Sequence, residues 1–232
     1  MLRFIFSFFG AIFALLTLGG VLASVLLAGI FFAYGNDLPD HEQLASYEPA
    51  TISRVYSGNG EVMDEFAQER RLFTPVDEIP DIVKQAFISA EDKNFYTHSG
   101  YDPSGIASAI FDRINGKKLR GASTIPQQVA KNFLLSGEVT VERKIKEIIL
   151  ATRIVSALGK DKVLELYLNE IDLGVRSFGV TAAADSYFAK QLEDLSIAEA
   201  AFWRYTPKVH MVIIQRIIMT KRWIVAMKSC VK

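Results

Sequence analysis

The sequence predicts a mainly α-helical protein, with one transmembrane helix at its N-terminus and a small β-hairpin before the helical region. Three observations support this prediction. The run from Phe4 to Tyr34 holds no charged residue, and apolar residues recur at helical spacing after Pro80. Between them, Ser57-Gly58-Asn59-Gly60 is typical of a turn between two short strands. With 232 residues, half of them hydrophobic, the chain is long enough for one full domain.

The apolar N-terminal run favours an uncleaved signal-anchor. As a helix it would measure about 46 Å, which exceeds the ~30 Å hydrocarbon core of a bilayer. A cleaved signal peptide is the alternative, because Val21-Leu22-Ala23 resembles a cleavage site, although a signal core usually spans only about 7–15 residues. Arg3 precedes the run and Asp37 follows it, so the positive-inside rule predicts a cytoplasmic N-terminus with the rest of the chain outside.

Composition divides the chain into four parts: residues 1–34 are the cytoplasmic tip and signal-anchor, 35–50 a linker, 51–202 the folded domain, and 203–232 an atypical basic, apolar tail. All 26 acidic residues lie between Asp37 and Glu199, whereas residues 204–232 hold seven basic residues and no acidic one. The acidic body has no basic stripe that would predict nucleic-acid binding. The single cysteine of the chain, Cys230 in the tail, excludes an intramolecular disulfide.

Local signals place each element of the folded domain in order. Residues 51–67 predict the hairpin, and Gly159 predicts the end of the longest helix. A capping-box pattern at Ser196 and Glu199 starts the last helix. The other predicted helices cover residues 82–91, 103–114, 124–135, 141–158 and 160–169.

Three polar stretches are candidates for chemistry. The first runs from Glu91 to Gly100 and places a carboxylate where a helix ends and a polar, aromatic loop begins. Glu91 is therefore a candidate general acid or base. Ordinary solvated acids at a helix end are the alternative. His98 has no second His or Cys at ligand spacing, which favours a structural hydrogen bond over a zinc site.

The second stretch runs from Gly121 to Asn132. Ser123 or Thr124 would cap a helix, and the N–H groups at such an end favour a phosphate or a carboxylate. An ordinary capped helix is the alternative. The adjacent glutamines Gln127 and Gln128 favour a binding surface.

The third stretch is Arg143-Lys144-Ile145-Lys146-Glu147. Arg143 and Glu147 are four residues apart on a predicted helix, so one interpretation is a surface ion pair worth a few tenths of a kcal/mol. The other interpretation is a carboxylate beside cations that bind a phosphorylated substrate. The sequence leaves both interpretations open.

Together these stretches resemble the glycosyltransferase domain of class A penicillin-binding proteins and the related monofunctional peptidoglycan glycosyltransferases. The family motif Glu-Asp-x-x-Phe-x-x-His-x-Gly matches from Glu91 to Gly100, and Gly-x-Ser-Thr-Ile-x-Gln-Gln-x-x-Lys-Asn matches from Gly121 to Asn132. The motif Arg-Lys-x-x-Glu matches from Arg143 to Glu147, and a fourth motif matches through Asn169 from Lys160 or Lys162. Order and spacing agree over about residues 45–202.

The resemblance implies a lysozyme-like helical fold and an enzyme that polymerises glycan strands. The acceptor would be lipid II and the donor the growing lipid-linked chain, with inversion at the anomeric carbon and release of undecaprenyl pyrophosphate. Glu91 would be the general base that deprotonates the acceptor's 4-hydroxyl, and Glu147 would orient the substrate or assist the leaving group. The implied substrate-binding residues are Asp92, His98, Ser123, Thr124, Gln127, Gln128, Lys131, Asn132, Arg143 and Lys146.

The same resemblance implies a single-pass protein of the cell (inner) membrane whose catalytic domain is periplasmic or extracellular. No metal ligands are predicted and no cofactor is required. The use of a divalent cation, Mg²⁺ or Mn²⁺, is left open, because some family members use one. The expected partners are lipid II, the lipid-linked glycan, the membrane and other cell-wall synthesis proteins, with no nucleic acid.

The match to the family motifs ends after Phe202, where the composition also changes, so we expect a C-terminally truncated chain that follows a reading-frame change. The Ser-x-x-Lys pattern at Ser229 and Lys232 has no Lys-Thr-Gly or Ser-x-Asn partner, so we expect no transpeptidase domain and no penicillin binding. One alternative function is an inactive relative that binds lipid II or cell-wall proteins without catalysis. A lysozyme-like hydrolase with Glu91 as general acid is another, but a hydrolase needs no pyrophosphate site.

Overall fold

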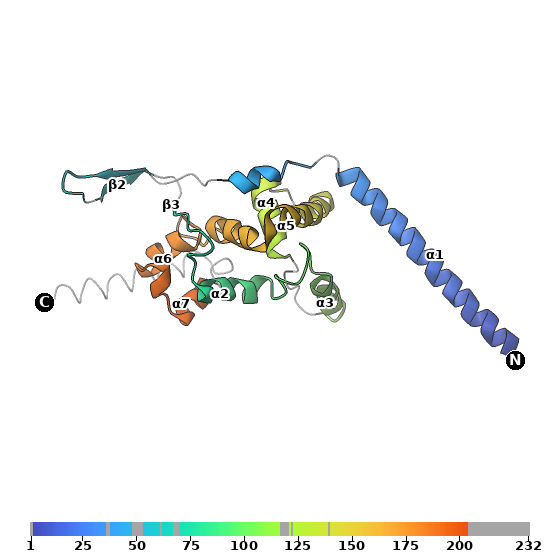
Figure 1. The fold of residues 1–232 in the computed structure, drawn as a ribbon. Helices are drawn as coiled ribbons and strands as arrows, with labels where there is room; N and C mark the ends of the chain where they lie inside the picture. Colours follow the sequence, from blue (N-terminus) through green and yellow to red (C-terminus); the bar gives the residue numbers. More distant parts are fainter. Residues whose placement is uncertain are drawn as a thin grey trace.

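The computed structural model describes residues 2–35, 38–47, 53–60, 62–66, 70–116, 121, 123–138 and 140–203. Within these ranges the protein is mainly helical, which confirms the predicted fold class (Figure 1). The predicted basic tail, from residue 204 onward, lies outside the described residues.

Helix α1 (Leu2–Gly35) extends away from the helical body of the protein (Figure 1). Among the described residues, one helical segment is long and apolar enough to cross a membrane, Ser7–Gly35, and most of its described side chains are exposed. At the end of α1, the carbonyl oxygen of Gly35 accepts a hydrogen bond of 2.9 Å from Nη2 of Arg153. A helix leaves its last carbonyls without partners inside the helix, so this contact satisfies one of them.

Part of the predicted linker packs onto the helical body. It contains the short 3₁₀ helix η1 (Glu42–Ser46), whose Leu44 is buried in the hydrophobic core. Next to it, the ring of Tyr47 meets the ring of Phe133 edge-on, with 4.8 Å between centroids. Leu44 is the one large aliphatic residue of this short helix, so the sequence gave no periodic signal there.

The predicted hairpin is confirmed. Strand β1 (Ser53–Tyr56) pairs antiparallel with β2 (Val62–Phe66), and the hairpin lies on the side of the body away from α1 (Figure 1). The sequence did not predict a second, parallel pair of two-residue strands, β3 (Arg70–Arg71) and β4 (Ser177–Phe178).

The helical body agrees closely with the predicted ranges. Thr124 caps α4 with a capping box, and the C-terminal half of α5 is buried from Val163 to Asn169. The sequence did not predict α6. The helices are α2 (Asp81–Glu91), α3 (Pro103–Ile114), α4 (Ile125–Leu134), α5 (Val141–Glu170), α6 (Val180–Phe188), the short 3₁₀ helix η2 (Leu192–Asp194) and α7 (Ile197–Phe202).

Helix α5 is two helical segments joined at Gly159, as the sequence predicted. Gly159 has φ 76° and ψ 170°, a conformation in which a side chain is strongly disfavoured. The glycine therefore lets one continuous stretch change direction, so that its second half enters the core.

Trp203 corrects the predicted boundary between the folded domain and the tail. The sequence grouped it with the tail, but its side chain is fully buried, with its ring 6.1 Å from that of Phe87 and 6.0 Å from that of Phe188. Charge composition did not predict this burial, because one buried aromatic ring leaves no mark on composition.

Candidate active site

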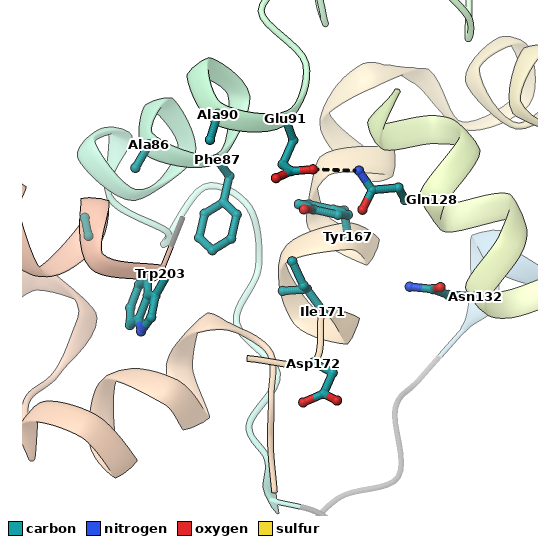
Figure 2. Close-up of a pocket in the computed structure, with 11 residues that line it drawn as sticks. Ala86, Phe87, Ala90, Glu91, Gln128, Asn132, Tyr167, Ile171, Asp172 and Trp203 are labelled. Carbon is teal, nitrogen blue, oxygen red and sulfur yellow. Dashed lines mark hydrogen bonds between the residues drawn. The ribbon is translucent and has the colours of Figure 1, made fainter. Parts of the chain in front are cut away.

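The site is built where the end of α2 meets α4 and α5. Glu91 is the last residue of α2, and its Oε2 accepts a hydrogen bond of 3.2 Å from Nε2 of Gln128 on α4 (Figure 2). The first and second predicted motifs are therefore in direct contact through two of their candidate residues.

Glu91 borders two pockets. The first, of about 240 Å³, is lined by Gln128, Asn132 and Tyr167 among others, and Trp203 lies on its opposite side in Figure 2. The second, of about 270 Å³, is lined by Asp92, Ser123 and Thr124 among others, with Asp102 and Asp112 adding carboxylates. Among the described residues, Ala90 and Glu91 are the two that line both pockets. A carboxylate in this position can contact groups bound on either side.

Asp92 and His98 hold the first motif against α4. The backbone N–H of Gly100 donates to Nδ1 of His98 at 3.1 Å, so Nε2 carries the proton and donates to Asp92 at 2.9 Å. Oδ2 of Asp92 also accepts from the N–H of Ile125 at 3.0 Å, at the start of α4. Asp92 is buried and lines the second pocket, whereas His98 lines neither pocket. His98 thus makes the structural hydrogen bond that its spacing predicted.

Gly100 ends the first motif because a side chain has no room there. Its φ is +135°, and an added Cβ would lie 2.7 Å from the backbone nitrogen of Thr152. The loop that follows Glu91 therefore packs backbone to backbone against α5, which fixes the end of α2 relative to that helix.

Thr124 and Gln127 are structural groups of the second motif. Thr124 donates its hydroxyl to the carbonyl of Gly100 at 2.6 Å, and its N–H donates to Oε1 of Gln127 at 3.2 Å. Gln127 is 1% exposed and lines neither pocket. Of the two adjacent glutamines, Gln128 lines the first pocket, whereas Gln127 turns into the cap of its own helix.

Glu147 on α5 is buried between two cations. Arg143 donates from Nη1 to its Oε1, and Lys144 donates from Nζ to its Oε2 at 2.8 Å. Glu147 is 3% exposed, so the interpretation as a surface ion pair is wrong. Lys144 also donates to Oγ of Ser123 at 2.7 Å, which joins the third motif to the second.

Lys144 is a residue that the site prediction left out. It lies three positions before Glu147 in the Arg-Lys-x-x-Glu pattern, and this i, i+3 spacing could have identified it. Lys146, which was included, pairs with Glu142 at 2.8 Å. Lys131 and Asn132 are exposed on α4, and Asn132 lines the first pocket.

The two lysines of the fourth motif have separate contacts. Lys160 lies over the ring of Phe95, 4.6 Å from its centroid, and 3.5 Å from Nδ1 of His98. Burial lowers the pKa of Lys160, and the charge of Asp92 opposes that shift. Lys162 instead pairs with Glu165 at 2.6 Å. Lys160 is therefore the one that contacts the first motif.

Chemically, the site combines a carboxylate between two pockets with a buried carboxylate held by two cations. In the part of the chain that the structure describes, no three His, Cys, Asp or Glu side chains are grouped to hold a metal ion. The arrangement suits proton abstraction by Glu91 and stabilisation of an anionic group near Arg143 and Lys144.

Comparisons with known proteins match this chain to one family. A family profile described as Transglycosylase matches residues 59–210, a range that continues past Phe202. Penicillin-binding protein 1A of Rickettsia typhi is 47% identical over 205 residues, which are 87% of this chain and 26% of the relative. Penicillin-binding protein 1A of Neisseria lactamica is 44% identical over 201 residues, which are 86% and 25% of the two chains.

A solved structure, the 2.6 Å crystal structure of penicillin-binding protein 1A from Haemophilus influenzae, aligns with a TM-score of 0.34 and 21% sequence identity. The alignment covers 70% of this chain and 15% of that chain. The chain spans about a quarter of the length of the curated relatives it matches.

Proposed function

This chain belongs to the transglycosylase family, and from that premise we propose that it polymerises lipid II into glycan strands, with inversion at the anomeric carbon and release of undecaprenyl pyrophosphate. The observation that carries the proposal is the position of Glu91 between two pockets. A polymerase must bring two lipid-linked sugars together, one as acceptor and one as donor, and its base must reach the bond-forming atoms between them.

Glu91 acts as the general base in this proposal. Its carboxylate takes the proton of the acceptor's 4-hydroxyl, and the oxygen attacks the anomeric carbon of the donor. The bond between that carbon and the pyrophosphate oxygen breaks, and the pyrophosphate leaves with the bonding electrons. The hydrogen bond from Gln128 supports this role, because it fixes one carboxylate oxygen and leaves the other for the substrate.

Positive charge stabilises the leaving pyrophosphate. The cations around Glu147 are the proposed source of that charge. Arg143 and Lys144 carry two positive charges against the single negative charge of Glu147. In this proposal Glu147 orients the two cations, and the exposed Lys131 adds a further charge on α4. A divalent cation, Mg²⁺ or Mn²⁺, would supply more positive charge of the same kind.

Helix α1 is the proposed signal-anchor, with its N-terminus in the cytoplasm and the helical body outside. Its length and apolar composition support a single membrane span. Both substrates are lipid-linked, so an anchored enzyme meets them in the same bilayer. Other cell-wall synthesis proteins are the proposed partners there.

The test is polymerisation of lipid II by the detergent-solubilised chain, with and without Mg²⁺ or Mn²⁺, followed on a gel. We expect polymer from the wild type, and Glu91→Gln to lower the rate by about 10²- to 10⁴-fold, the usual contribution of a general base. Glu193→Gln is the matched control, because Glu193 is exposed on η2 and lines neither pocket.

A Glu91→Gln variant that polymerises at the wild-type rate would remove Glu91 from the mechanism. A folded wild type that binds lipid II but forms no polymer would favour the inactive relative, the alternative that the motifs alone left open.

A further inference from the structure

The first pocket contains a buried hydroxyl that the mechanism above does not use. Tyr167 on α5 is 2% exposed, and its OH has no hydrogen-bond partner among the residues that the structure describes. Nearly all buried polar groups in native proteins are hydrogen-bonded, so an exception calls for an explanation. A ligand that completes the hydrogen bond is one such explanation.

The packing of the ring does not require this hydroxyl. The ring of Tyr167 meets the ring of Phe87 edge-on, with 6.0 Å between centroids, and a phenylalanine would make the same contact. Tyr187 provides the contrast within the same fold. It is also buried, but its OH donates to the carbonyl of Leu173 at 2.5 Å, so that hydroxyl has a structural role.

Tyr167 lies beside the proposed base. It lines the first pocket together with Glu91 and Gln128, and Figure 2 shows its ring next to the hydrogen-bonded pair that they form. Burial raises the pKa of Tyr167, and the negative charges of Glu91 and Asp92 raise it further. The hydroxyl therefore keeps its proton at neutral pH and can act as a donor next to a carboxylate that can only accept.

We propose that Tyr167 donates a hydrogen bond to an oxygen of the sugar that binds in the first pocket, and so positions that sugar against Glu91. The identity of the ligand rests on the proposed function. Glu91 and Tyr167 divide the work in this proposal: the carboxylate accepts from a sugar hydroxyl, and the phenol donates to a second sugar oxygen. The two contacts together fix the orientation of the sugar, which one contact cannot do.

The test compares Tyr167→Phe with Tyr187→Phe in the full chain in detergent, with lipid II as the probe. We expect Tyr167→Phe to raise the Kd for lipid II by about 2- to 12-fold, the net effect of one neutral hydrogen bond, without lowering the melting temperature. Tyr187→Phe removes a hydroxyl with a structural partner, so it should lower the melting temperature and leave the Kd unchanged.

Two results would overturn the proposal for Tyr167. One is an unchanged Kd in Tyr167→Phe, and the other is a higher Kd accompanied by a lower melting temperature. Neither result bears on the proposed function, which the polymerisation assay of the wild type decides separately. Conversely, a wild type that binds lipid II without polymerising it would overturn the catalytic proposal, and a raised Kd in Tyr167→Phe would still support the contact.

Discussion

Lys144 and Lys146 lie two positions apart on α5 and have very different surroundings. Lys144 donates to the buried Glu147 and also to Ser123 and Gln127. Lys146 pairs with Glu142, whose side chain is 54% exposed. Two lysines in the same stretch thus pair with carboxylates of very different exposure.

We predict that Lys144→Met lowers the free energy of unfolding by about 1–3 kcal/mol, because it leaves Oε2 of the buried Glu147 without its donor. Lys146→Met leaves the buried Glu147 with both of its donors and should therefore cost less than Lys144→Met. Urea unfolding of both variants measures the difference. Equal losses would mean that Lys144 does not hold the buried cluster together.

The motifs predicted well which residues lie together at the site. They predicted less well the role of each residue there. Glu91, Gln128 and Thr124 do come together around α4. Gln127 turns into the cap of its own helix, and Tyr167 has a buried hydroxyl facing the site. These roles depend on contacts between helices far apart in the sequence, which residue type and spacing do not encode.

At the scale of elements, Gly159 controls the course of α5. An added Cβ at this position would meet nothing within 4 Å, so the cost of a side chain comes from the backbone conformation alone. We predict that Gly159→Ala destabilises the protein by about 1–3 kcal/mol in thermal or urea unfolding.

Gly137→Ala is the matched control for this prediction. Its Cβ also meets nothing within 4 Å, and its φ lies outside the positive range. It should change stability by less than about 1 kcal/mol, in the stabilising direction. If both variants lose the same stability, the bend at Gly159 does not depend on glycine.

Local signals explain why most helices were predictable. The Thr124 capping box and Gly159 mark helix boundaries with residues close by in the chain. The pairing of β3 with β4 joins Arg71 to Phe178, and its short strands carry no periodic pattern. Helix α6 begins after Gly179, where an added Cβ would lie 2.7 Å from the carbonyl oxygen of Asn169. That close approach exists only in the folded chain.

For the molecule as a whole, two carboxylates make the free energy of unfolding depend on pH in the acidic range. Hydrogen bonds from Ser104 and then from Asn94 lower the pKa of Asp102 to about 2 at the start of α3. The backbone N–H of Ser196, followed by Lys190, lowers the pKa of Glu199 to about 2 at the start of α7. Unfolding returns both groups to ordinary values near 4. Their stabilisation is therefore present above about pH 4 and is lost as the pH falls towards 2.

We predict that the melting temperature falls steeply between about pH 4 and pH 2. Asp102→Asn should show a smaller fall, because asparagine caps a helix as well as aspartate and does not titrate in this range. Melting curves across this range test the prediction. Parallel curves for the two proteins would show that Asp102 does not contribute to the acid sensitivity.

The bond between Arg153 and Gly35 ties the end of α1 directly to α5. A flexible linker after α1 would let the distance between the helical body and the bilayer vary. With α1 as the proposed membrane anchor, this junction would hold the helical body at one height above the bilayer. Successive lipid-linked sugars would then arrive by lateral diffusion at one fixed height, and the search for the next substrate would become two-dimensional.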